Sequence, residues 1–167
     1  MLVFLNLTME LIKSISGIRG IVGKNLDTDI TNHYSSIFSN IQEDGNFLVA
    51  RDSRPHGKDI YDEICKILTS LGRNVISCDI IPTPTAQYII KEKKLAGGIV
   101  ITASHNPIEW NGLKFLDNDG CFLNSKKMKL ILSKKPSHPI NDYTGDVKEA
   151  KNAYQHHIQN ILNLNCI

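Results

Sequence analysis

Residues 97–107, GGIVITASHNP, decide the fold of this chain. The β-branched run from Ile99 to Thr102 is entered through a glycine pair and left through small and polar residues. This pattern is typical of a buried strand that ends in an exposed loop. Ser104 lies just beyond the carboxyl end of that strand, where open α/β sheets bind their ligands. We therefore expect a ligand-facing loop at Ser104.

Several reactive side chains follow in or near this loop. His105 and Asn106 come directly after Ser104, Pro107 removes a backbone donor, and Lys114 begins a second apolar run ten positions after Ser104. A hydroxyl, a proton carrier, an amide and a cation are thus expected close together. The same short polar residues also form ordinary turns. The loop by itself therefore leaves both a catalytic and a structural role open.

Extended and helical segments alternate along the chain. Short apolar runs predict strands at 11–15, 47–50, 74–78 and 99–102, and apolar residues at helical spacing predict amphipathic helices between them. A hairpin is expected at 113–123, turning at Asp119-Gly120 and adding an antiparallel edge. The alternation predicts an α/β fold: a three-layer α/β/α sandwich around a mixed, mostly parallel sheet.

The alternating aspartates of this hairpin also suit a divalent metal. Asp117 and Asp119 are spaced as Mg²⁺ or Ca²⁺ ligands can be. No third carboxylate is in register, however, and the glycine after Asp119 fits a turn. We interpret both residues as turn formers.

Two further segments place arginines beside turns. Residues 16–23, SGIRGIVG, contain glycines that permit tight turning, so Arg19 is suited to bidentate phosphate recognition. Arg51-Asp52-Ser53-Arg54 directly follows the strand expected at 47–50. For residues 16–23 the plain alternative is a β-bulge or hairpin with a solvated Arg19. For residues 51–54 it is a solvated turn that caps the next helix.

Composition limits the class of protein. The chain has 167 residues, of which 41% are hydrophobic and 22% charged, and these values are ordinary for a globular domain. The net charge of +2 gives no reason to expect nucleic acid or membrane as a partner. Residues 1–7 are apolar but too short to span a bilayer and lack a basic leader region, so we expect a cytoplasmic protein that starts at Met1 or Met9. The widely spaced cysteines predict reduced thiols and no zinc site: Cys65, Cys78, Cys121 and Cys166.

Residues 102–107, TASHNP, and 111–114, NGLK, resemble the phosphoserine loop of the α-D-phosphohexomutases. This family includes phosphoglucomutase, phosphomannomutase and phosphoglucosamine mutase. Residues 16–20, SGIRG, resemble its N-terminal motif, and residues 51–54 resemble the Arg-Asp-x-Arg turn that braces the floor of its active site. The resemblance covers only the first of the family's four domains. It assigns 1–10 to an extension, 11–145 to domain I and 146–167 to a helix leading into a second domain.

The resemblance implies transfer of a phosphoryl group on a hexose phosphate through a bisphosphorylated sugar. Ser104 would carry the phosphoryl group, Lys114 would supply charge, and His105 would transfer a proton or orient the phosphate. Arg19 and Asn106 would bind substrate. Bracing of the site is implied for three residues: Arg51, Asp52 and Arg54. Mg²⁺ would bridge the Ser104 phosphate to aspartates of the second domain, and a glucose 1,6-bisphosphate-type activator is implied.

The residues that would distinguish glucose, mannose and glucosamine phosphates belong to the family's other domains. The family's Asp-Gly-Asp-Gly-Asp metal loop is not present in the sequence. We therefore expect a chain that folds but is inactive without domains II–IV. The apolar stripe within 147–162, which includes Tyr154, Ile158 and Ile161, is expected to form a non-native dimer.

Three alternatives remain open at this point. A serine hydrolase would pair Ser104 with a distant histidine (His33, His56 or His138), but no Gly-x-Ser-x-Gly elbow surrounds Ser104. A non-catalytic module would bind a sugar phosphate or a partner and keep only the fold. Within the family, a phosphoglucosamine mutase domain is the alternative to the phosphoglucomutase/phosphomannomutase type.

Overall fold

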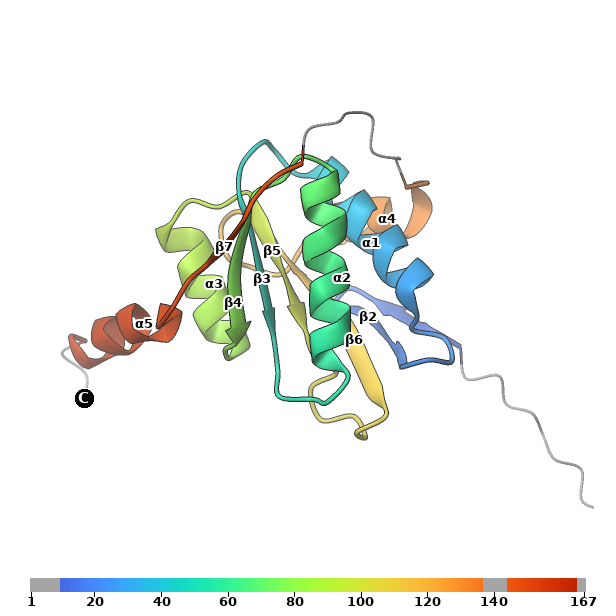
Figure 1. Ribbon diagram of the computed structural model, residues 1–167, viewed down its shortest axis with the longest axis horizontal. Helices are drawn as coiled ribbons and strands as arrows, with labels where there is room; N and C mark the ends of the chain where they lie inside the picture. Colours follow the sequence, from blue (N-terminus) through green and yellow to red (C-terminus); the bar gives the residue numbers. More distant parts are fainter. Residues whose placement is uncertain (1–9, 137–143, 165–167) are drawn as a thin grey trace, which may run out of the picture.

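The computed structural model describes residues 10–136 and 144–164, which are organised on a seven-stranded sheet of order β1-β2-β6-β5-β3-β4-β7. Strands β2, β3, β4, β5 and β7 run in one direction, and β1 and β6 run in the opposite one. The mixed, mostly parallel sheet is therefore confirmed (Figure 1). The strands are β1 Ile12–Ser14, β2 Gly17–Ile21, β3 Phe47–Arg51, β4 Val75–Ile80, β5 Gly97–Ile101, β6 Trp110–Leu116 and β7 Val147–Glu149.

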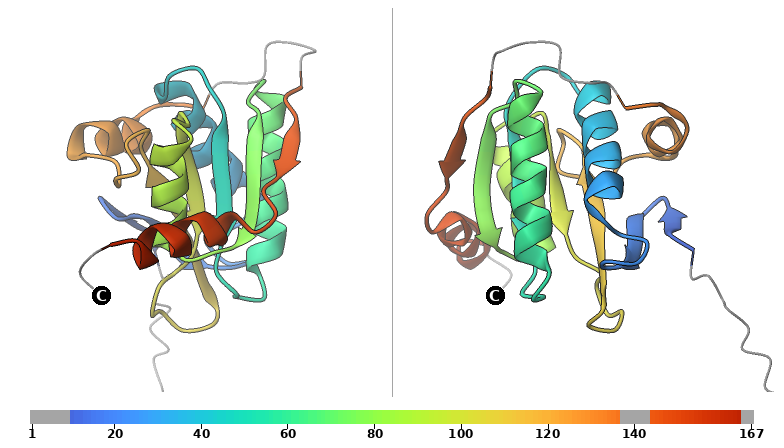
Figure 2. Two further views of the ribbon diagram at one scale, coloured as in Figure 1. Left: turned by 90° about the vertical axis from the view of Figure 1, so that its left-hand side faces the viewer. Right: turned by 45° about the vertical axis from the view of Figure 1, so that its right-hand side comes forward.

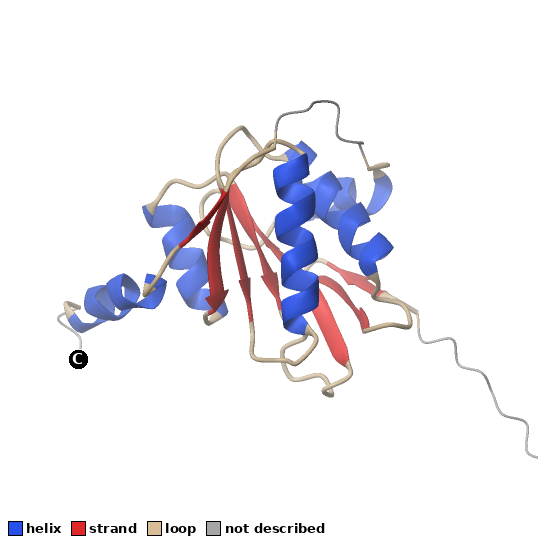
Figure 3. Cartoon of the chain, viewed as in Figure 1, coloured by secondary structure: helices blue, strands red, loops and turns tan. Residues whose placement is uncertain are grey.

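Helices cover both faces of the sheet, as the three-layer prediction requires. Helices α1 (Thr28–Ile41) and α2 (Gly57–Ser70) lie on one face, and α3 (Thr83–Glu92) lies on the other, as Figure 2 shows with the sheet seen from its side. Helix α4 (Ser125–Ser133) packs against α1, and α5 (Ala153–Leu162) lies against α3 (Figure 3). Within the described residues, no helix is long and apolar enough to cross a membrane.

Strand β5 is the centre of the core. All five of its residues are buried, with Ile99 and Ile101 packed toward α1 and α2 and Val100 packed toward α3. A strand buried on both faces needs a continuous apolar sequence, which explains the run seen at 99–102. Gly98 is required here because a Cβ would lie 2.9 Å from the backbone oxygen of Leu48 on β3. The prediction of a buried strand followed by a loop is confirmed.

The hairpin interpretation predicts that the antiparallel strand lies at the edge of the sheet, and this is wrong for β6. It lies between β5 and β2, and the edge beyond it is β1. Residues 121–123 contribute only an isolated bridge between Leu116 and Phe122. Strand β2 occupies the place of a second hairpin strand because its backbone pairs with β6 from Ile18 to Ile21. The turn at Asp119-Gly120 is confirmed, with Gly120 at a φ of +80°.

The segment after residue 145 also differs from the prediction of a continuous helix. Residues Val147–Glu149 form β7, which pairs in parallel with β4, and α5 begins only at Ala153. The unpaired edge of β4 offers backbone groups that a strand satisfies and a helix does not: Val75 N–H donates to Asp146 O at 2.8 Å. The sheet therefore extends past the expected domain boundary at residue 145.

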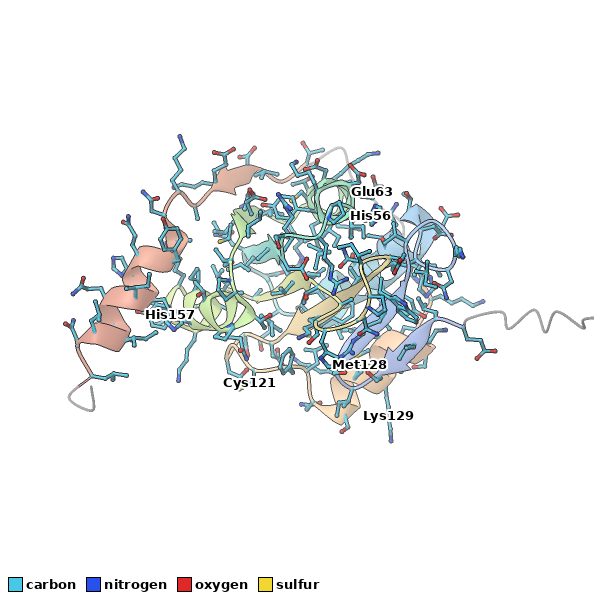
Figure 4. The ribbon with its side chains drawn as sticks, turned by 90° about the horizontal axis from the view of Figure 1, so that it is seen from below. His56, Glu63, Cys121, Met128, Lys129 and His157 are labelled. Atoms are coloured by element: carbon cyan, nitrogen blue, oxygen red, sulfur yellow. The ribbon has the colours of Figure 1, made fainter. Side chains whose placement is uncertain are left out.

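Helix α5 contributes no buried residue. It is held to α3 by His157, whose Nδ1 lies 3.0 Å from Thr85 Oγ1 and whose ring stacks on Tyr88 at 4.8 Å (Figure 4). The apolar residues Tyr154, Ile158 and Ile161 are 45%, 49% and 38% exposed. The expected dimer through this stripe stays a prediction. The extension up to Met9, His138 and Cys166 lie outside the described residues.

A half-buried charge cluster fixes the turn after β6 to two helices. Lys127 Nζ donates to Asp117 Oδ1 at 2.6 Å and to Gln42 Oε1 at 2.8 Å, and Gln42 Nε2 donates to Asp117 Oδ1 at 3.1 Å. Burial alone would raise the pKa of Asp117, but hydrogen bonds from Lys127, from the Asn118 N–H and from Gln42 outweigh burial and lower it. The cluster therefore stabilises the charged carboxylate in the folded chain.

We predict that Asp117→Asn lowers the free energy of unfolding by about 1–2 kcal/mol at pH 7. Because the folded pKa is depressed, this contribution is complete above the unfolded value of about 4 and is lost as pH falls through the folded pKa. Urea unfolding at several pH values should show the difference shrinking in acid. Asp62→Asn, which removes an exposed pair with Lys58, should cost less than about 0.5 kcal/mol and serves as the control.

Candidate active site

Ser104 lies in the loop between β5 and β6, at the carboxyl end of the parallel strands and at the lower edge of the sheet in Figure 1. Its side chain is exposed, and its φ of +59° puts the backbone in the left-handed region. For a residue with a Cβ this conformation costs about 1–2 kcal/mol. Such a residue persists only where its surroundings hold it.

The guanidinium of Arg54 holds this loop from inside. Its Nη1 donates to Pro107 O at 2.6 Å and to Trp110 O at 3.0 Å, and its Nη2 donates to Ser104 O at 2.8 Å and to Asn106 O at 2.7 Å. The side chain of Arg54 is only 11% exposed. One planar cation thus satisfies four carbonyl groups that would otherwise need water, and it sets the path of the loop.

Asp52 forms hydrogen bonds with Arg54, whereas the side chain of Arg51 forms an ion pair with a residue of the neighbouring strand β4. Asp52 accepts Arg54 Nε at 3.3 Å and the Arg54 N–H at 3.0 Å. Arg51 Nε donates instead to Asp79 Oδ1 at 2.6 Å, at the end of β4. Asp52 and Arg54 therefore lie against the Ser104 loop, and Arg51 does not. No motif in the sequence points to Asp79, which lies beside an irregularity in the β3–β4 pairing.

Arg19 reaches the loop from β2. Its Nη1 donates to Asn106 Oδ1 at 3.4 Å, its Nη2 donates to Ser16 Oγ at 3.1 Å, and its buried Nε has no partner. Arg19 lies across Gly112 of β6, where a Cβ would be 2.9 Å from Arg19 Cγ and 2.5 Å from Ile18 O. Glycine at 112 therefore allows the arginine to lie flat on the sheet. Sequence reasoning missed the role of Ser16.

Lys114 lies on the same face of β6, because Arg19 pairs with Gly112 and side chains alternate along a strand. Its Nζ is 5.5 Å from the centre of the Phe122 ring. Burial lowers the pKa of Lys114, the charge of Arg19 lowers it further, and Asp52 acts in the opposite direction. The positive charges of Lys114 and Arg19 repel each other, so binding of an anion near them would be electrostatically favourable.

The histidine beside Ser104 is His105, with Nδ1 3.3 Å from Ser104 Oγ. His33 lies edge-on to Tyr34, and His56 lines a cavity between the starts of α1 and α2 (labelled in Figure 4), so neither contacts Ser104. Neither His33 nor His56 therefore forms the pair with Ser104 that a serine hydrolase would need. Of the cysteines in the described segments, Cys65 and Cys78 are buried and Cys121 is exposed, and all are free.

The site residues do not by themselves fit a metal. Among the described residues, no group of three or more His, Cys, Asp or Glu side chains is arranged to hold an ion. A phosphate on Ser104 would offer ligands from one side only. This edge of the sheet carries an exposed hydroxyl at Ser104, and Arg19 contacts the same loop through Asn106, a combination that suits a phosphorylated ligand.

A family model described as phosphoglucomutase/phosphomannomutase, alpha/beta/alpha domain I, matches residues 11–137. The chain therefore belongs to the phosphohexomutase family, and the matched part is its N-terminal domain. A phosphoglucosamine mutase of Prochlorococcus marinus subsp. pastoris is 31% identical over 160 residues, which are 93% of this chain and 35% of that protein. A phosphoglucosamine mutase of Thermoanaerobacter sp. is 38% identical over 118 residues, covering 67% of this chain and 26% of that protein.

The fold comparison agrees. A phosphoglucomutase/phosphomannomutase family protein from Burkholderia thailandensis superposes with a TM-score of 0.73 at 22% identity, covering 90% of this chain and 36% of that one. At that identity the likeness concerns the fold alone. The chain spans about a third of the length of the Prochlorococcus relative, 35%.

We predict that Arg54→Lys destabilises the fold by about 2–3 kcal/mol, because a lysine ammonium cannot serve four carbonyls in one plane. Hydrogen exchange should also accelerate over residues 102–110 specifically. Arg51→Lys is the matched control: its partner Asp79 is 60% exposed, so we expect a loss below about 1 kcal/mol and no change in that loop. Equal effects of the two variants would contradict the role given to Arg54.

Proposed function

We propose that this chain is the phosphoserine-bearing domain of a phosphohexomutase, in which Ser104 accepts and returns the phosphoryl group of a hexose phosphate. The observation that carries the proposal is the exposed Ser104 hydroxyl on a loop fixed by Arg54 and contacted by Arg19, with Lys114 on the same face of the sheet as Arg19. Family membership supports it, because members of this family are named as mutases of sugar phosphates.

Phosphoryl transfer requires in-line placement and charge compensation more than covalent chemistry by the protein. In the proposed step, Ser104 Oγ forms a bond to phosphorus while the bond from phosphorus to the sugar oxygen breaks. The hydroxyl proton leaves Oγ, and the sugar oxygen becomes protonated. His105, 3.3 Å from Oγ, is placed to accept that proton or to orient the phosphate. Lys114 and Arg19 compensate the charge of the phosphoryl oxygens, and Asn106 helps to hold Arg19 in place.

The substrate class follows the relatives. Matching relatives are named phosphoglucosamine mutase, so glucosamine phosphate is the first sugar to assay, with glucose and mannose phosphates beside it. We propose Mg²⁺ and a glucose 1,6-bisphosphate-type activator for the longer protein only. The described residues do not supply a metal site of their own. A cytoplasmic location remains part of the same proposal.

We further propose that the 167 residues alone do not turn over substrate. A phosphoserine brings about two negative charges at neutral pH, and Lys114 with Arg19 cannot replace a bound metal and the phosphate-clamping loop of the fourth domain. Most contacts to the sugar would also come from the other domains, so the substrate would rarely reach an in-line geometry. Domains II–IV of a longer protein would be the partner that completes the site. Steady turnover of glucose 1-phosphate by the purified chain, abolished in Ser104→Ala, would contradict this.

We predict that Ser104 is the residue that becomes phosphorylated. Incubation with glucose 1,6-bisphosphate followed by mass spectrometry should place one phosphate on Ser104, because its hydroxyl is exposed on the loop that Arg19 contacts through Asn106. Ser104→Ala should take up none, and Ser125→Ala, at the start of α4, should behave as the unmodified chain. Phosphate on Ser125 with Ser104 bare would overturn the assignment. Saturable binding of the sugar phosphate with no phosphoserine would favour the non-catalytic module.

We also predict that Lys114→Ala, in a longer protein carrying this domain, lowers turnover by at least about 100-fold, which is typical for loss of one preorganised charge. Lys114→Arg should not restore it, because a planar fork replaces a point charge poorly. The control is Lys129→Ala, an exposed lysine of α4, the helix that packs against α1 (labelled in Figure 4). Near-normal turnover in Lys114→Ala would leave the residue a structural role only.

A further inference from the structure

The backbone of Ser104 is fixed from both sides by side chains. Its carbonyl accepts Arg54 Nη2 at 2.8 Å, and its N–H donates to Thr102 Oγ1 at 2.9 Å. The peptide groups before and after the residue are therefore both anchored, while its φ stays at +59°. Of the torsions that aim the hydroxyl, only the rotation about Cα–Cβ is left free.

Thr102 is well placed to act as an anchor. It is only 7% exposed, and its own N–H donates to Gly112 O at 2.9 Å, which attaches it to β6. A β-branched side chain has few rotamers, so the position of Oγ1 is set once the backbone is set. Residue 112 is also the glycine over which Arg19 lies. The same stretch of β6 therefore places Thr102 and allows Arg19 to approach.

We infer that Thr102 is a positioning residue: its hydroxyl oxygen holds the Ser104 N–H and thereby keeps Ser104 in the left-handed conformation that points Oγ out of the loop. An isolated serine favours other regions of φ and ψ, and a left-handed serine is retained only when its surroundings over-determine it. Arg54 fixes the carbonyl side alone. Without the Thr102 oxygen, the N–H of the peptide between Ala103 and Ser104 loses its acceptor, and that peptide is held only by the hydrogen bond from the Asn106 N–H to Ala103 O at 3.2 Å. The weaker hold lets the peptide tilt, and Oγ moves with it.

The conformational part of this inference is independent of chemistry at Ser104, and only its catalytic consequence rests on the proposed function. The test is a double-mutant cycle on the purified 167-residue chain. Thr102→Val removes the acceptor at nearly constant shape, and Thr102→Ser retains it. Each is made with Ser104 and in the Ser104→Gly background, where glycine adopts a positive φ without steric cost. The equilibrium constant for unfolding is measured for every variant.

We expect Thr102→Val to raise the unfolding constant about tenfold when Ser104 is present and less than about threefold in the Ser104→Gly background. Thr102→Ser should stay within about threefold in both. The inference would also be supported if the single variant Thr102→Val fails to fold and the double variant with Ser104→Gly folds. An equal effect of Thr102→Val in the two backgrounds, or no rescue by serine, would overturn it, because a hydroxyl that merely fills its site has no reason to depend on residue 104.

A second readout follows Ser104 itself. With glucose 1,6-bisphosphate, the initial rate of Ser104 phosphorylation should fall at least about tenfold in Thr102→Val and recover to within about threefold in Thr102→Ser. Unchanged phosphorylation in Thr102→Val would overturn the positioning role. If the unmodified chain takes up no phosphate, the prediction that Ser104 becomes phosphorylated in this chain fails, and the cycle alone decides the role of Thr102.

Discussion

The structure depends on the position of β5 between a parallel and an antiparallel neighbour. Because β3 and β5 are parallel, their carboxyl ends meet, and residues 52–54 come to lie beside the Ser104 loop. Because β6 runs back against β5, it starts at that same edge, and it carries Gly112, over which Arg19 lies, and then Lys114 on the same face. Thus side chains from three distant parts of the sequence converge near β5, where the strand pairing changes from parallel to antiparallel.

Much of this arrangement could be predicted from the sequence. A strand buried on both faces has a continuous run of apolar residues, and an amphipathic helix has apolar residues every three or four positions. The position of β6 and the presence of β7 could not be predicted. β7 is three exposed residues long, so it carries no hydrophobic pattern, and only the unpaired edge of β4 explains it. The interior place of β6 depends on pairing with β2, some ninety residues away, which local reasoning does not see.

At the site, the motifs identified which side chains matter but not which way they point. Arg51 and Arg54 look equivalent in the sequence, yet Arg51 donates to Asp79 of β4 and Arg54 donates to the Ser104 loop. Hydrogen bonds such as those of Ser16, Asp79 and Thr102 depend on backbone geometry, so residue type alone does not announce them. Local features that disfavour folding gather here: a left-handed serine, two neighbouring cations and a buried Arg19 Nε without a partner. Sites that bind ligands commonly tolerate such conflicts.

The choice of arginine to organise the Ser104 loop has a consequence for acidity. A guanidinium group keeps its charge across the pH range in which proteins stay folded. The four carbonyls that Arg54 gathers therefore remain gathered in mild acid and in mild base alike. The path of the Ser104 loop is thus set by a charge that neither mild acid nor mild base removes.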